Sequence, residues 1–106
     1  RRIIDAMRDF TDVLANVNRR VTLVRHDRTI RDAALVLLNL VCSTEEVTTE
    51  VEKSYSTALD ILKGLAWRSN QLDKTVAEEL EVTRWAPEDM VYQAQQLVLM
   101  LDEMDL

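Results

Sequence analysis

The sequence predicts an all-α protein, and three observations lead to that class. The chain of 106 residues contains one glycine and one proline, although β and α/β folds draw on both for their turns. Hydrophobic residues make up 47% and charged residues 30%, which is typical of a globular protein. Apolar residues recur at spacings of three and four, the period of helices that bury one face. We expect one helical bundle domain over residues 1–106, and the absence of a methionine before Arg1 predicts a piece of a longer chain.

The first helix is expected over residues 2–24. Its apolar positions form a narrow seam of the coiled-coil type, made of Ile3, Met7, Phe10, Leu14, Val17, Val21 and Val24. The next two steps of this seam fall on Arg28 and Arg31. The regular pattern is therefore lost between residues 24 and 32.

This loss of pattern has three interpretations. One helix from 2 to 42 could bury both arginines, which is costly unless each meets a carboxylate. The helix could instead continue with its apolar row shifted by one residue, so that Arg28 and Arg31 turn toward water. Or the helix ends near Arg25 and Asp27 caps a new one, although no glycine or proline enforces a stop. We favour the shift or kink, and expect both arginines to be mostly exposed.

The second segment, residues 28–42, is apolar almost all round. Its seam consists of Ile30, Ala34, Leu37 and Val41, flanked by Leu35, Leu38 and Cys42 on one side and by Ala33, Val36 and Leu40 on the other. Only Asp32 and Asn39 mark a polar strip. Most of this helix must therefore be covered, and the single cysteine is expected to be a small buried residue.

A capping box predicts where the third helix begins. In the stretch 43–46, Ser43 can accept a hydrogen bond from the backbone of Glu46 while Glu46 reaches back, so we expect a helix start within two residues of Thr44. The helix could continue to Thr83. Its seam would consist of Val47, Val51, Ser54, Ala58, Ile61, Leu65, Leu72, Val76 and Leu80, widened by Tyr55, Leu59, Leu62 and Ala66.

The last helix is expected to begin at Pro87. Proline and the two acidic residues after it are all favoured in a first helical turn. The buried side of this helix is predicted to hold Met90, Ala94, Leu97, Leu101 and Met104, with Val91 and Val98 alongside. Trp67 and Trp85 are expected at the core or its rim.

Two architectures follow, depending on whether the first helix continues through residues 24–32 or breaks there. A nearly continuous helix over 2–42 predicts an antiparallel helical hairpin with a shorter additional helix, a three-helix bundle. The last helix could not then reach residues 33–42, so an apolar surface at the hairpin tip would stay open for a partner. That surface is centred on Leu35, Val36, Leu38 and Leu40. A break near residues 25–28 predicts instead a compact four-helix bundle without this apolar surplus.

Charge and motifs exclude several function classes. The net charge of −6 repels phosphate and argues against nucleic acid, and the longest apolar run, 33–42, is too short for membrane insertion. Arg25, His26 and Asp27 are sequence neighbours, which point in different directions on a helix. Glu46 and Glu50 have no Glu-x-x-His partner for a metal, and no glycine-rich loop suggests a phosphate site. We therefore expect no enzyme, no cofactor, no metal and no small-molecule substrate.

The function expected from this pattern is a non-catalytic helical module for protein–protein interaction or oligomerisation. Its partner would be another protein helix or a second copy of the chain. The alternative is a compact structural or adaptor segment of a larger protein. One cysteine excludes an internal disulfide, which suits a reducing, cytoplasmic location.

Residues 86–102 resemble the third helix of BAG co-chaperone domains. The matching positions are Ala86, Asp89, Val91, Gln95, Leu97, Leu101 and Asp102. The resemblance covers about one sixth of the chain and implies a long helical hairpin with a shorter third helix. The basic residues with which BAG domains grip the chaperone's ATPase domain are absent, and Glu88, Tyr92 and Gln93 stand nearby instead.

Overall fold

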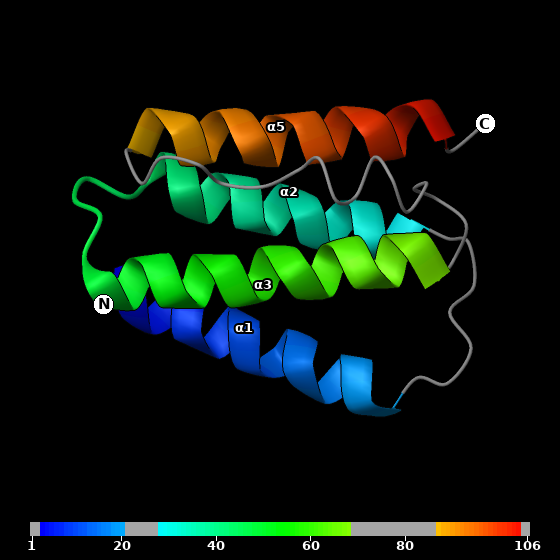
Figure 1. Ribbon diagram of the computed structural model, residues 1–106, viewed down its shortest axis with the longest axis horizontal. Helices are drawn as coiled ribbons and strands as arrows, with labels where there is room; N and C mark the ends of the chain where they lie inside the picture. The colour runs from blue at the N-terminus through cyan, green and yellow to red at the C-terminus, as the bar shows by residue number, and fades with distance from the viewer. Residues whose placement is uncertain (1–2, 21–27, 69–86, 105–106) are drawn as a thin grey trace.

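Four helices make up most of the described part of the protein (Figure 1). The computed structural model describes residues 3–20, 28–68 and 87–104. The helices are α1 (Ile3–Arg20), α2 (Arg28–Cys42), α3 (Thr49–Arg68) and α5 (Pro87–Met104). No strand occurs within these three ranges. The all-α class predicted from the turn residues and the helical period is confirmed, as is the start of the last helix at Pro87.

The helices pack in pairs that do not follow chain order. α2 packs most extensively on α5, and α1 packs most extensively on α3. α2 also contacts α3 and, to a smaller extent, α1. α2 runs antiparallel to the other three helices, as the colour gradient in Figure 1 shows. The bundle measures 34 × 25 × 20 Å along its principal axes.

Of the two predicted architectures, the helical hairpin is wrong. α1 ends at Arg20, α2 begins at Arg28, and the two helices contact each other side by side. A nearly continuous helix over 2–42 would not allow that contact. The four-helix alternative is confirmed, and it lets the most apolar helix bury its surface against α5. The residues between α1 and α2, including His26, lie outside the described ranges.

The prediction for the two arginines at this junction fails for one of them. Arg31 is half-buried rather than mostly exposed, while the side chain of Arg28 lies outside the described residues. On the helical wheel, Arg31 stands about 90° from the centre of the buried row of α2. A residue at such a flank can lay its aliphatic stem along apolar neighbours. The position of Arg31 beside the buried row of α2 therefore explains why its side chain is half-buried although the residue is not part of the core.

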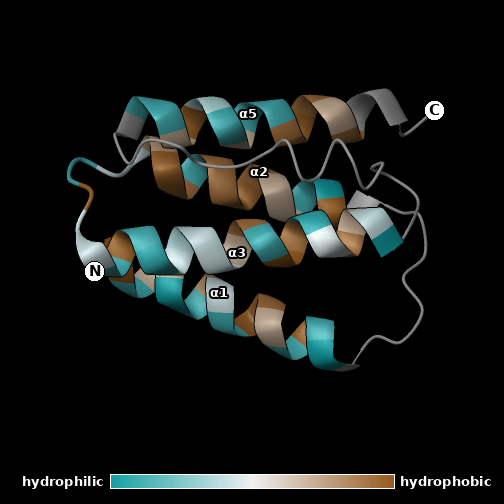
Figure 2. Cartoon of the chain, viewed as in Figure 1, coloured by the Kyte–Doolittle hydropathy of each residue, from teal (hydrophilic) through white to brown (hydrophobic). Residues whose placement is uncertain are grey.

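The core follows the predicted seams of α2 and α5 closely. On α2 the four seam residues are all buried: Ile30, Ala34, Leu37 and Val41. On α5 the buried residues are Met90, Ala94, Leu97, Val98 and Leu101. α3 contributes Val51, Tyr55, Ala58, Leu59, Leu62, Leu65 and Ala66. Figure 2 shows the resulting concentration of hydrophobic residues along α2.

The seam predicted for α1 is only half right. Met7 and Leu14 are buried, but Phe10 is half-buried and Val17 is exposed. Thr11 is buried instead, and its hydroxyl oxygen lies 2.8 Å from the backbone oxygen of Met7 and 3.2 Å from that of Ser54, so its single proton can be donated to either one. A carbonyl partner offsets the cost of burying a hydroxyl. A small polar residue thus sits where α1 meets α3.

The capping box predicted at 43–46 is not formed. The Ser43 hydroxyl donates to the backbone oxygen of Asn39 at 3.0 Å, and the Thr44 hydroxyl donates to that of Leu40 at 2.9 Å. Both residues therefore close the end of α2 instead of starting α3. Serine and threonine hydroxyls can serve either role, and here they donate hydrogen bonds to the carbonyl oxygens at the end of α2.

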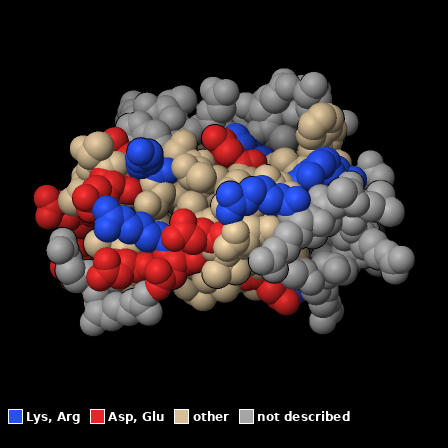
Figure 3. Space-filling view, turned by 90° about the horizontal axis from the view of Figure 1, so that it is seen from below, with Lys and Arg blue, Asp and Glu red and all other residues tan. Residues whose placement is uncertain are grey.

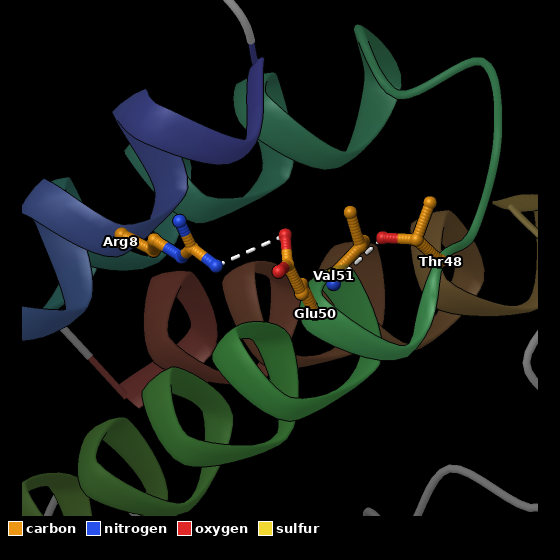
Figure 4. A network of polar contacts seen from close by, with 4 residues as sticks. All are labelled: Arg8, Thr48, Glu50 and Val51. Atoms are coloured by element: carbon orange, nitrogen blue, oxygen red, sulfur yellow. Dashed lines mark hydrogen bonds and ion pairs between the residues drawn. The ribbon is translucent and has the colours of Figure 1, made fainter.

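The actual start of α3 lies at Thr49, five residues later than predicted. The hydroxyl of Thr48 accepts a hydrogen bond from the backbone N–H of Val51 at 3.2 Å (Figure 4). This is the usual arrangement of a residue that caps a helix N-terminus. Glu50 and Glu52 follow in the first turn, where negative charge is favoured. The predicted continuation to Thr83 lies outside the described residues.

The cysteine and the two tryptophans were all expected in the core or at its rim. Cys42 is exposed, so the expectation of a buried cysteine is wrong. It is the last residue of α2, where the chain turns away from the bundle. Trp67 is also exposed, near the end of α3, and Trp85 lies outside the described ranges.

Candidate protein-interaction surface

The four residues predicted for partner binding all lie on α2, but mostly within the bundle. Leu35, Leu38 and Leu40 are half-buried and pack against the core. Val36 alone is exposed, at 44%. The geometric premise for this surface was that the last helix cannot reach residues 33–42, and that premise is wrong because α5 packs extensively on α2.

These four residues also do not share one face of α2. At about 100° per residue, Val36 and Leu40 fall on one side of the polar strip and Leu35 and Leu38 on the other. Asp32 is exposed between the two groups. A single partner helix could not contact all four without displacing the helices that cover α2. Their role in binding stays a prediction, with less physical support than the sequence suggested.

The structure draws attention to other apolar residues. The exposed large hydrophobic residues of the described chain are Val13, Val17, Val36, Trp67, Tyr92 and Leu99. Single residues of this kind are normal on protein surfaces. Pairs on one helix face are more informative, since they can fill a continuous contact. Such pairs occur twice: on α1 at spacing four, and on α5 at spacing seven.

The α1 pair, Val13 and Val17, lies among charged groups. Asp9, Asp12 and Arg19 are exposed on the same helix. A partner covering the two valines would also remove water from these charges, which is costly without matching counter-charges. The α1 pair is therefore the weaker candidate for a binding surface.

The residues between the two members of the α5 pair are uncharged. Tyr92 is 58% exposed and Leu99 is 54% exposed. Positions seven apart lie on the same face of a helix. Gln95 is exposed and Gln96 half-buried between them, and Glu88 is exposed one turn before Tyr92. We call these five residues the outer face of α5.

The opposite side of α5 is firmly anchored. Met90, Leu97 and Leu101 are buried. The hydroxyl of Tyr55 donates to the backbone oxygen of Met90 at 3.2 Å, which ties α3 to the first turns of α5. Burial of Tyr55 raises the pKa of its hydroxyl above the ordinary value by desolvation, so the group is a neutral donor at neutral pH. The outer face is therefore presented by a fixed helix, and a partner meets a preorganised surface.

The charged groups of the molecule lie mainly elsewhere. Seen from below, acidic side chains gather toward one end, and Lys and Arg are interspersed across the middle and the other end (Figure 3). Arg8 of α1 pairs with Glu50 of α3 at 2.9 Å on this surface (Figure 4). The guanidinium of Arg68 donates to the side-chain oxygen of Asn18 and links the ends of the same two helices. Arg8 and Arg68 therefore each have a polar partner on the neighbouring helix.

Two open depressions lie along α1 and α3. One of about 380 Å³ is bordered by Ile4, Thr44, Glu46 and Val51. The other, of about 550 Å³, contains the Arg8–Glu50 pair. Both are open to solvent and bordered by polar and charged residues, so neither has the enclosed, apolar character of a small-molecule site.

No group of three or more His, Cys, Asp or Glu in the described ranges could hold a metal ion. None of the described helices combines the length and the apolar character that crossing a bilayer requires.

Comparison with known proteins gives no relative from which a function could be transferred. No protein family matches the chain, and neither a curated protein nor a solved structure is significantly similar to it. The BAG resemblance of residues 86–102 implied a long hairpin, and the observed reversal between α1 and α2 removes that architectural support.

The sequence did hold a signal for the outer face of α5. Residues 90–101 contain no charged residue. Placing Met90, Ala94, Leu97 and Leu101 on the buried side leaves position 92 and position 99 opposite them by helical periodicity. A helix face opposite its own core is normally polar, so tyrosine and leucine there were already anomalous.

Proposed function

We propose that this protein is a non-catalytic helical module that binds another protein through the outer face of α5. The observation that carries the proposal is the exposed pair Tyr92 and Leu99 on one helix face that is uncharged between the two residues. Tyrosine is favoured in interfaces because its large rigid ring gives contact area at low entropic cost. A neighbouring leucine at helical spacing suits a partner helix, which would lie along α5.

The proposal includes the kinds of partner and the setting expected from the sequence. The partner is another protein helix or a second copy of the chain, and the net charge of −6 disfavours nucleic acid. Cys42 is an exposed free thiol. Such a thiol would be prone to intermolecular disulfides outside a reducing compartment, which supports an intracellular location.

A selection experiment tests the module. Helical peptides from a randomised library displayed on yeast are enriched with the purified chain as bait. We expect enriched peptides to lose binding to Tyr92→Ser/Leu99→Ser and to keep binding to Val13→Ser, a matched change of an exposed residue on α1. Peptides that bind both variants equally, or no enrichment at all, would contradict the assignment to α5.

A second candidate is a compact structural or adaptor segment of a larger protein. The observation in its favour is that α2, the most apolar helix, packs against α5, α3 and α1, so its apolar residues need no external partner. Light scattering over a concentration series separates the two ideas in part. A second copy as the partner of α5 requires self-association that the Tyr92→Ser/Leu99→Ser variant lacks, whereas the structural segment stays monomeric.

A further inference from the structure

The side of α3 that points away from the core carries the glycine of the chain. Gly64 is half-buried, and a Cβ added at this position would meet no atom of the described structure within 4 Å. The fold therefore does not require glycine here, although glycine is one of the least favoured residues inside a helix. The missing side chain leaves a notch in the helix surface through which another backbone can approach closely.

Four residues surround this notch on the same face of the helix. They lie three or four positions from Gly64, the spacing of neighbours on one helix face, and they are Asp60, Ile61, Trp67 and Arg68. Asp60 and Arg68 are exposed, and Trp67 is 45% exposed. Ile61 is half-buried. We call Gly64 and these four residues the outer face of α3.

The charges of this face are arranged symmetrically about the glycine. Asp60 lies four residues before Gly64, and Arg68 lies four residues after it. The carboxylate of Asp60 lies 3.4 Å from the amine of Lys63, and its side chain is 70% exposed. The guanidinium of Arg68 donates from Nε to the backbone oxygen of Gly64 at 3.4 Å and from Nη2 to Asn18. A carboxylate accepts several hydrogen bonds and a guanidinium has five donors, so both groups can bind a further partner.

A second copy of the chain matches this arrangement. Rows of residues four apart become parallel when two helices cross at about −50°, which is the commonest packing angle. If two α3 helices run in opposite directions and a two-fold axis passes between their Gly64 residues, Asp60 of each copy meets Arg68 of the other. Row on row, side chains would normally collide at the crossing point, but both copies have glycine there. Because a two-fold contact is isologous, the same ion pair forms twice.

We propose that the chain forms a dimer in which the outer faces of α3 of two copies pack antiparallel across Gly64. Asp60 and Arg68 form an ion pair with the other copy at both ends of the contact. Trp67 and Ile61 lie on either side of the row and supply apolar area that leaves water when the copies meet. This surface is on a different helix from the outer face of α5, so the inference is independent of the proposed function.

Charge reversal tests the pairing. Sedimentation velocity of the purified chain, over a series up to about 1 mM, the range of very weak complexes, measures the dimer Kd. We expect the parent chain to dimerise. Asp60→Arg alone and Arg68→Asp alone should each raise the Kd at least about tenfold, because each places like charges opposite one another at both ends. An equal mixture of these two variants should dimerise like the parent, because their charges are again opposite.

A second substitution tests the notch. Gly64→Leu should prevent dimerisation by placing a side chain at the crossing point. Its melting temperature should not be lower than that of the parent, because leucine is favoured in helices and a Cβ at this position meets no neighbour. Loss of the dimer in a fully folded variant excludes misfolding as the cause. Tyr92→Ser/Leu99→Ser should dimerise like the parent.

Each contrary result overturns the inference. It fails if the parent chain stays monomeric up to about 1 mM, or if Gly64→Leu dimerises like the parent. Single charge variants that lose the dimer and do not regain it on mixing overturn the antiparallel pairing of Asp60 with Arg68. Self-association that is lost in Tyr92→Ser/Leu99→Ser but kept in Gly64→Leu places the contact between copies on α5, which supports the proposed function instead.

Discussion

The hydrogen bond between Tyr55 and α5 gives a prediction whose size follows from the structure. Tyr55 is fully buried, and its hydroxyl donates to the backbone oxygen of Met90 at 3.2 Å. Tyr55→Phe removes this bond but keeps the ring that fills the core. The bond joins two neutral groups, so we expect the loss typical of a neutral hydrogen bond, about 1 kcal/mol. For a domain of this size the melting temperature should fall by roughly 4–8 °C.

The same tyrosine predicts how stability responds to alkali. Its pKa is raised in the folded protein by burial, so the unfolded chain releases the proton first as the pH rises. Fewer bound protons in the unfolded state make stability fall with increasing pH. The contribution is complete below the ordinary tyrosine pKa of about 10 and is lost from there up to the raised folded value. The slope is at most about 1.4 kcal/mol per pH unit.

Urea unfolding followed by far-UV circular dichroism measures both effects. Denaturation from about pH 9 to about pH 11, on either side of the ordinary tyrosine pKa, should show a steeper loss for the parent chain than for Tyr55→Phe. Tyr92→Phe serves as the control, since Tyr92 is exposed and its removal should leave the slope of the parent. If Tyr55→Phe and the parent lose stability in parallel, or if Tyr92→Phe removes the slope, the reasoning from burial is refuted.

Four other substitutions examine the core, a helix cap with its control, and the surface, each by urea unfolding at neutral pH. Leu97→Ala should cost about 2–5 kcal/mol, because Leu97 is fully buried on α5; a cost below about 1 kcal/mol would place it at the edge of the core. Thr48→Ala should cost about 1 kcal/mol by removing the cap of α3, and Ser43→Ala should cost less than Thr48→Ala if the cap lies at 48. Glu50→Gln should cost less than about 1 kcal/mol, because its pair with Arg8 is exposed; a larger cost that disappears at high salt would show a stronger pair.

The elements that the sequence predicted well are those with strongly periodic apolar patterns. The seam residues of α2, such as Leu37, and those of α5, such as Leu97, are buried as expected. On these helices the buried row is set by size and hydrophobicity, which the residue letters contain. Pro87 marks the start of α5 for an equally local reason, since proline is favoured in a first helical turn.

The failures share a different physical origin. Thr11 can be buried because two backbone oxygens, one of them on another helix, are within reach of its single hydroxyl proton. Ser43 closes α2 rather than opening α3 because the carbonyl of Asn39 is within reach. Both choices depend on partners that a hydrophobic pattern does not describe. The geometric premise of the predicted binding surface was wrong for a similar reason, because the position of α5 on α2 depends on where the chain reverses, and no glycine or proline marks that reversal.

The residues Val36 and Leu40 provide a final test of which part of α2 is free. The two lie one turn apart on the same side of the helix, but Val36 is 44% exposed while Leu40 packs against the core. Val36→Asp should therefore change stability by less than about 0.5 kcal/mol, as surface substitutions usually do. Leu40→Asp should cost more, roughly 1–3 kcal/mol, because it removes the apolar contacts of a half-buried leucine and places a carboxylate against apolar neighbours. Against a total stability of about 5–15 kcal/mol, that cost should lower the urea midpoint markedly. If Leu40→Asp is instead tolerated as well as Val36→Asp, Leu40 is not held by the bundle, and the surface of α2 centred on these residues regains its case as a binding site beside the outer face of α5.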